Sequence, residues 1–184
     1  MQKHIYLPLN DKSIHTLRAG ERVLLSGTVY TARDAAHKRM IEQLQDGKRL
    51  PFDVNRQVIY YVGPTPEKPG QVIGSAGPTT SSRMDKYTPA LLNLGLKGMI
   101  GKGYRNEDVK RAIVNNKAVY FGSIGGSAAL ISRSIKAVEV VAYEELGTEA
   151  IRKLTLEKFP CIVLYDAFGG DQYEIGKNMY RELE

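Results

Sequence analysis

The sequence has little cysteine and no long apolar run, and each absence excludes a class of protein. Cys161 is the only cysteine among 184 residues, which excludes a disulfide framework and is typical of a protein in a reducing cytoplasm. One thiol also excludes a self-contained iron–sulfur or cysteine-rich zinc site, because such sites need several thiolates. No run of about 18 apolar residues is present, and the N-terminus lacks the apolar segment of a signal peptide. We therefore expect no membrane span.

Positive charge is in excess but is not concentrated. The formal net charge is +6, which suits a nucleic acid, an acidic partner or an anionic substrate. No continuous run of lysine and arginine marks a nucleic-acid-binding tail. The eleven tyrosines could stack on bases, so a non-catalytic basic nucleic-acid-binding domain is one alternative. Against it, no RNA-recognition signature is present.

The apolar pattern predicts one α/β domain over residues 1–184, with a mixed sheet flanked by helices. An apolar content of 42% is enough for one core. We expect strands at 21–30, 56–64, 71–77, 98–103, 118–126, 138–147 and 161–171. We expect helices at 31–47, 87–95, 106–117, 127–135 and 148–159, with Thr31 and Asn106 as N-caps. The last eight or so residues are expected to be frayed or to face a partner.

Two arginines stand where strands give way to helices. Arg33 lies in the first turn after a strand, where the helix dipole and free N–H groups favour an anion. Its guanidinium can grip a carboxylate through two hydrogen bonds, although a surface pair with Asp34 or Glu42 is the simpler interpretation. Arg83 follows the hydroxyl-rich loop "GSAGPTTSSRMD", in which a polar turn is the simpler interpretation.

Lys102 stands between two glycines at the end of "GMIGKG", where a ligand can approach the backbone closely. The glycine corner at Gly125 and Gly126 could cradle an anion. His37 has no partner at metal-ligand spacing and is expected to pack or to hydrogen-bond. Together, three cations and a hydroxyl cluster at the ends of elements favour a site for a small polyanion such as a dicarboxylate.

Five blocks then carry a family resemblance: "TARDAAHKRM", "YYVGPTP", "GSAGPTTSSRMD", "GMIGKG" and "FGSIGGSAAL". In this order, over roughly residues 5–175, they resemble the β subunit or C-terminal domain of class I fumarate hydratases and the related L-tartrate dehydratases. The resemblance implies a swivelling β/β/α domain that closes over a 4Fe–4S cluster. It places that cluster on a cluster-bearing α subunit or separate domain, which agrees with the single Cys161.

The resemblance also implies roles for residues. Arg33 and Arg83 match the family's substrate-binding arginines, and Lys102 matches its active-site lysine. Thr79 and Thr80 match its threonine pair, of which the first is the candidate base for the C3 proton of malate. The loop reads "TTSSR", where the family more often has Ala–Gly or Ser–Gly before the arginine. The implied assembly is a cytoplasmic hetero-oligomer, and the implied reaction is reversible hydration of fumarate to (S)-malate, with tartrate dehydration as the alternative.

Overall fold

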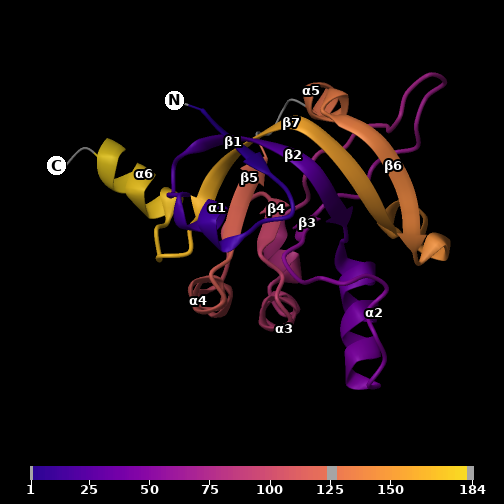
Figure 1. The fold of residues 1–184 in the computed structure, drawn as a ribbon, viewed down its shortest axis with the longest axis horizontal. Coiled ribbons are helices and arrows are strands. Elements are labelled where there is room, and N and C mark those ends of the chain that lie inside the picture. Colours follow the sequence, from indigo (N-terminus) through magenta and orange to yellow (C-terminus); the bar gives the residue numbers. More distant parts are fainter. Residues whose placement is uncertain (1, 124–127, 182–184) are drawn as a thin grey trace.

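A computed structural model describes residues 2–123 and 128–181, and its strands form one mixed, seven-stranded sheet that closes on itself (Figure 1). The strands are β1 (Lys3–Tyr6), β2 (Arg22–Thr31), β3 (Val58–Tyr60), β4 (Gly98–Gly101), β5 (Val119–Ser123), β6 (Ile135–Ala142) and β7 (Ile151–Tyr165). Strands β1 to β5 run parallel in the order of the chain. The long β7 runs antiparallel to β5, β6 and β2. Its pairing with both β5 and β2 closes β2–β3–β4–β5–β7 into a ring.

Helices cover the outside of this ring on one side (Figure 1). The helical elements are α1 (Asp11–His15), α2 (Asp34–Gln45), η1 (Ser81–Met84), α3 (Thr88–Asn93), α4 (Glu107–Asn115), α5 (Ala128–Arg133), η2 (Glu144–Glu149) and α6 (Gln172–Tyr180). Helices α2, α3 and α4 each follow one of the parallel strands and lie on the same side of the sheet. This arrangement confirms the predicted α/β class with a mixed sheet flanked by helices.

Two apolar cores follow from the alternation of side chains along the strands. One core fills the ring and includes Leu25, Phe121 and Cys161. The other lies between the sheet and helices α2 to α4 and includes Met40, Tyr61 and Tyr120. Burial raises the pKa of the Cys161 thiol above its usual range. The single cysteine is therefore a core residue.

Three predicted features were wrong. Residues 148–159 were expected to be helical, but they form the end of η2 and most of β7. The segment 71–77 contains no strand. Thr31 does not cap α2: it ends β2, and its hydroxyl accepts a hydrogen bond of 2.9 Å from the N–H of Arg152. The predicted cap at Asn106 is confirmed, since its side chain accepts from the N–H of Val109.

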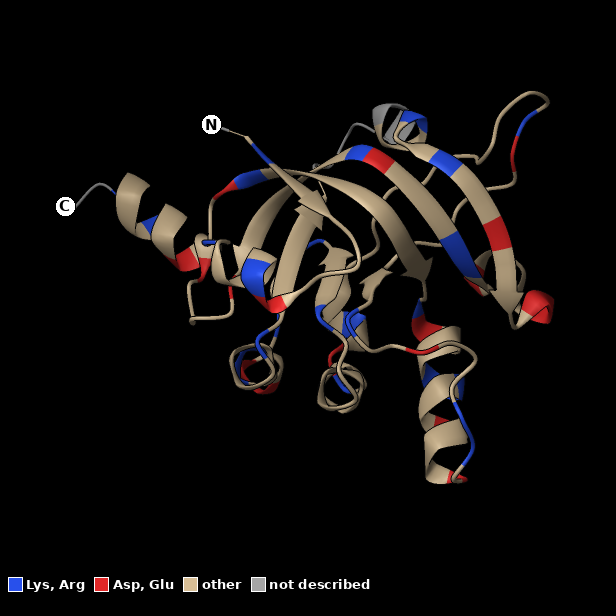
Figure 2. Ribbon diagram, in the orientation of Figure 1, with Lys and Arg blue, Asp and Glu red and all other residues tan. Residues whose placement is uncertain are grey.

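The last eight or so residues were expected to be frayed or to face a partner, and of these, residues 177–180 form the end of helix α6. Lysines, arginines and acidic residues are spread over most elements (Figure 2), as the sequence pattern indicated. Tyr60, Tyr61 and Tyr120 are fully buried, so these three are unavailable for stacking on bases. In the described ranges 2–123 and 128–181, every helix is too short or too polar to cross a bilayer.

Candidate active site

The sequence-predicted residues gather at one edge of the ring, where the parallel strands β2, β3 and β4 end. Arg33 follows β2, the loop 79–83 follows β3, and Lys102 follows β4. Ligand sites in sheets of parallel strands lie at the carboxyl ends of the strands, in closed barrels as well as in open sheets. We call this edge the rim, and it consists of Arg33, Asp34, Thr79, Thr80, Arg83, Lys102 and Glu149.

The loop 79–81 is wedged between the ends of β3 and β4. The N–H of Thr79 donates to the carbonyl of Tyr61 at 2.8 Å, and the N–H of Ser81 donates to the carbonyl of Lys102 at 2.9 Å. Thr80 forms a parallel bridge with Lys102. The backbone of the loop is thus held from both sides, while Thr79 is half-buried and Thr80 is exposed.

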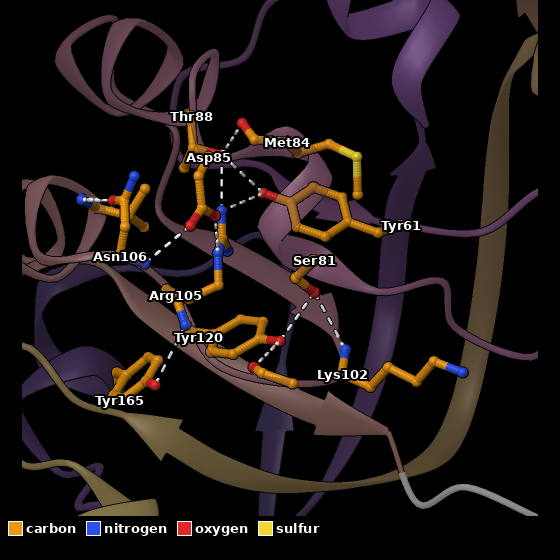
Figure 3. Close-up of polar contacts among 12 residues, drawn as sticks. Tyr61, Ser81, Met84, Asp85, Thr88, Lys102, Arg105, Asn106, Tyr120 and Tyr165 are labelled. Atoms are coloured by element: carbon orange, nitrogen blue, oxygen red, sulfur yellow. Dashed lines mark hydrogen bonds and ion pairs between the residues drawn. The ribbon is translucent and has the colours of Figure 1, made fainter.

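The side chain of Ser81 fixes this loop to Tyr120 and to the backbone of Lys102 (Figure 3). Its side chain is buried, with its Oγ 2.8 Å from the hydroxyl of Tyr120 and 3.1 Å from the N–H of Lys102. Gly101 is required beside it, because any Cβ there would collide with the Ser81 hydroxyl. This occupied, buried hydroxyl is poorly suited to exchange a proton with a substrate. Of the other hydroxyl groups in "TTSS", that of Thr79 is half-buried, and those of Thr80 and Ser82 are exposed.

Asp34 connects the two arginines of the rim. Its Oδ1 accepts a hydrogen bond of 2.8 Å from Nε of Arg83, and its Oδ2 lies 3.8 Å from Nε of Arg33. Arg33 also approaches Glu149 at 3.6 Å and lies over Gly63, where a Cβ would come within 2.8 Å of its Nη1. Arg33 therefore pairs with Asp34, as the simpler interpretation of the sequence expected, and it also lies on the rim.

The N-terminus of α2 is already occupied by a carboxylate of this chain. Glu149 accepts a hydrogen bond of 2.8 Å from the N–H of Ala35, in the first turn of the helix, where acidic groups are favoured. This N–H group is therefore already paired, whereas the guanidinium groups of Arg33 and Arg83 are the cationic groups nearby. The rim carries three cationic side chains against the two carboxylates of Asp34 and Glu149.

A buried ion pair lies beneath the rim (Figure 3). Nε of Arg105 lies 2.6 Å from Oδ1 of Asp85, with the arginine side chain fully buried. Asp85 also accepts from the N–H of Asn106, and Arg105 donates to the hydroxyl of Thr88. Burial alone would lower the pKa of Arg105, but nearby Tyr61 and Asp85 raise it above its usual value. The pair joins the segment after Arg83 to the segment after Lys102.

His37 is a neutral, buried histidine rather than a ligand. Its Nδ1 lies 2.9 Å from the carbonyl of Arg33, and its ring packs edge-on against Tyr61 and stacks on Tyr87. Burial lowers its pKa to about 4, with Arg105 contributing in the same direction. The prediction that His37 packs and hydrogen-bonds is confirmed.

The structure thus joins the predicted residues in two groups: Arg33 with Arg83 through Asp34, and Thr80 with Lys102 through the backbone. Sequence reasoning missed Asp85, Arg105 and Glu149, whose partners lie far away along the chain. The "RMD" that follows the hydroxyl run was a signal for Asp85, but nothing in the sequence named its partner. Gly125 and Gly126 lie outside the described residues.

The residues of this chain do not fit the ligation of an iron–sulfur cluster. Such a cluster needs several thiolates, and the single Cys161 faces the interior of the ring. In the described parts of the chain, no group of three or more His, Cys, Asp or Glu side chains is placed to hold a metal ion.

The fold and the rim together define an α/β domain that presents an open, cationic edge at the ends of its parallel strands. The family model for the fumarase C-terminus matches residues 2–176, and the chain belongs to this family, which contains the β subunits and C-terminal regions of class I fumarate hydratases and L-tartrate dehydratases. This membership confirms the family resemblance drawn from the sequence blocks.

Relatives of two lengths match the chain. A Methanocaldococcus jannaschii protein with the provisional name L(+)-tartrate dehydratase subunit beta is 36% identical over 98% of this chain and 96% of its own length. The aerobic class I fumarate hydratase of Escherichia coli K12 is 41% identical over 83% of this chain and 28% of its own length. Fumarate hydratase 2 of Leishmania major is 40% identical over 84% and 28%, respectively. The chain thus spans about a quarter of these fumarate hydratases.

Proposed function

We propose that this chain is the β subunit of an iron–sulfur hydro-lyase that hydrates fumarate reversibly to (S)-malate. The observation that carries the proposal is the convergence of Arg33, Arg83, Thr79 and Lys102 on one rim of a fumarase C-terminus domain. In this proposal the 4Fe–4S cluster belongs to a cluster-bearing α subunit, because the lone Cys161 cannot hold it. The assembly would be a cytoplasmic hetero-oligomer.

The arginines bind the two carboxylates of the substrate in this proposal. A guanidinium offers a planar fork of donors that matches a carboxylate, and two such forks on one rim suit a dicarboxylate. Lys102 adds an exposed ammonium on the neighbouring strand end. Asp34 and Glu149 offset two of the three positive charges of the rim, so the proposed fit to a dicarboxylate rests on the two guanidinium forks rather than on net charge.

Thr79 is the proposed base for the C3 proton. A threonine hydroxyl has a very high pKa in water, so its alkoxide needs nearby cations and fixed donors. Arg83 lies four residues further along the same loop, and the backbone of Thr79 is fixed on the end of β3. Thr80, exposed and bridged to Lys102, is proposed to shape the loop and to donate to the substrate.

Tartrate is the second candidate substrate. The relative that matches over nearly its whole length has a tartrate dehydratase name, and the same arginines would serve a substrate that differs from malate by one hydroxyl. Turnover of malate against L-tartrate by the assembled enzyme distinguishes the two. A ratio of kcat/KM that favours tartrate would replace fumarate in the proposal.

The purified chain alone should be colourless and inactive toward fumarate and tartrate, since one thiol cannot ligate the cluster. Anaerobic mixing with an α subunit that carries a cluster should produce hydro-lyase activity and a visible absorption band. Activity of the chain alone at an enzymatic rate would contradict the division between subunits. An inactive mixture with a loaded α subunit, tested on both substrates, would contradict the proposed reaction.

A further inference from the structure

Asp34 touches both arginines of the rim. It occupies the first turn of α2, directly after Arg33, and it is forty-nine residues before Arg83. Its Oδ1 lies 2.8 Å from Nε of Arg83, whereas its Oδ2 is buried 3.8 Å from Nε of Arg33 without a hydrogen bond in the described part of the chain. One carboxylate therefore lies between two guanidinium groups that would otherwise repel each other.

The contact with Arg83 leaves the binding end of that arginine available. Asp34 engages Nε, on the inner edge of the guanidinium, and the side chain of Arg83 remains 51% exposed. Among the described residues, no hydrogen bond involves either of its terminal nitrogens. A guanidinium held by Nε keeps its two Nη groups free to form a fork with an incoming carboxylate.

Arg33 is oriented from the opposite side. Glu149 approaches its Nη2 at 3.6 Å, and Gly63 leaves room for its Nη1. Its Nε is buried, faces Oδ2 of Asp34 and forms no hydrogen bond within residues 2–123 and 128–181. A small shift of Asp34 would close this contact while Oδ1 keeps Arg83.

We propose that Asp34 is a positioning residue that fixes the orientation and separation of Arg33 and Arg83, so that the two forks together accept a dicarboxylate. This proposal rests on the proposed function for its substrate, and the contacts that define it do not depend on that function. Asp34 touches no substrate in this scheme. It lowers the entropic cost of binding by restricting two long side chains before the substrate arrives.

The first experiment measures the contact without any turnover. In the chain labelled with ¹⁵N-arginine, NMR should show a distinct Nε–H signal for Arg83, identified by its loss in Arg83→Lys. Asp34→Asn should move that signal and accelerate its exchange with water at least several-fold. An Arg83 signal unchanged in position and exchange rate by Asp34→Asn would overturn the proposal, whatever the enzyme proves to catalyse.

The second experiment uses the complex assembled with its α subunit and the substrate that it turns over. Asp34→Asn should raise KM about tenfold and change kcat less than about threefold, because uniform binding is lost. In an Arg83→Lys background, which lacks Nε, the same change should raise KM less than about threefold. Equal effects in both backgrounds would overturn the coupling between Asp34 and Arg83.

Asp108→Asn is the matched control. Asp108 also lies in the first turn of a helix, α4, and also pairs with an exposed arginine, Arg111. It shares with Asp34 any effect of helix-dipole or surface-charge loss, but its ion pair is with Arg111 rather than with an arginine of the rim. Its KM should stay within about twofold of the parent, and a rise equal to that of Asp34→Asn would assign the effect to surface charge alone.

Discussion

Thr79 and Thr80 are neighbours in the chain but differ in their surroundings. Thr79 is half-buried at the end of β3, and Thr80 is exposed beside Lys102. Thr79→Ala should lower kcat on the order of 10²- to 10⁴-fold with little change in KM, the range of a general-base loss. Thr79→Ser should keep a larger share of the activity, because a hydroxyl remains.

Exchange of the C3 proton of malate with deuterated solvent, measured on the assembled complex, tests this role directly. Thr80→Ala serves as the comparison, and we expect it to keep most of the exchange. Parental exchange in Thr79→Ala would move the base to Thr80 or to a residue of the partner.

Arg33 and Arg83 should both be sensitive to a change that keeps their charge. Lysine has no planar fork, so Arg33→Lys and Arg83→Lys should each lower kcat/KM on the order of 10²-fold, equivalent to about 2.7 kcal/mol. Circular dichroism should show an unchanged fold. Steady-state kinetics near the parental values for both variants would return these arginines to the role of surface ion pairs.

His37 gives the fold a dependence on pH. Its pKa is lowered from 6.5 to about 4 in the folded chain by burial, with Arg105 adding to the shift and Asp34 opposing it. Between these values the unfolded chain binds the extra proton, so stability is complete above about pH 6.5 and falls as the pH drops toward 4. We expect the free energy of unfolding to fall by about 2 kcal/mol from pH 7 to pH 5 through this group.

Urea denaturation at the two pH values measures this loss, and His37→Gln is the comparison because its amide binds no proton in this range. The variant should be less stable at pH 7 but should lose about 2 kcal/mol less than the parent on acidification. Parallel pH profiles for the two proteins would show that His37 is not the titrating group.

At the scale of elements, the Arg105–Asp85 pair holds η1 and α3 against the start of α4. Arg105→Met should cost about 3 kcal/mol of stability, because it leaves the Asp85 carboxylate buried without its partner. The double replacement Arg105→Met and Asp85→Leu should recover part of that loss. Urea denaturation measures both.

The exposed ion pair between Arg111 and Asp108 in α4 provides the control. Arg111→Met should change stability by less than about 1 kcal/mol, as is usual for surface ion pairs. A loss in Arg105→Met no larger than this would mean that the buried pair contributes little to holding the two segments together.

The sequence predicted the elements that alternate regularly and failed where the alternation is broken. Residues 151–159 bury Ile151, Leu154, Leu156 and Phe159, a spacing close to that of a helix. The register shift between β2 and β7, and the positive φ of 51° at Lys158, account for the three-residue step from Leu156 to Phe159 within the strand. Pairing with distant strands makes this segment a strand, and the local sequence pattern contains no information about that pairing.

The candidate site was predictable to the extent that its residues follow strands. Arg33 stood out because it follows a strand at the start of a helix, and Arg83 and Lys102 stood out because hydroxyl groups or glycines surround them at strand ends. Arg105 and Glu149 were not predictable, because their hydrogen-bond partners, Asp85 and Ala35, lie 20 and 114 positions away in the sequence. A single sequence contains no record of which distant charges meet.

At the scale of the whole molecule, the chain spans nearly the full length of one relative and about 28% of the fumarate hydratases. The same domain thus occurs both by itself and as one part of a longer chain. All the residues of the rim belong to this one domain. They lie in η2 or in the segments that follow β2, β3 and β4. This agrees with the proposal that the other reacting groups come from a partner.

The closing strand β7 has a consequence for the synthesis of the protein. Among the described residues it is the last strand in sequence order, and its pairing with both β5 and β2 closes the ring. A nascent chain that has emerged only as far as β6 therefore has all the parallel strands but no closed ring, and Leu25 and Phe121 lack their neighbours on β7, Phe159 and Val163. We expect the ring to close on the ribosome only after Tyr165 has left the exit tunnel, in one late step.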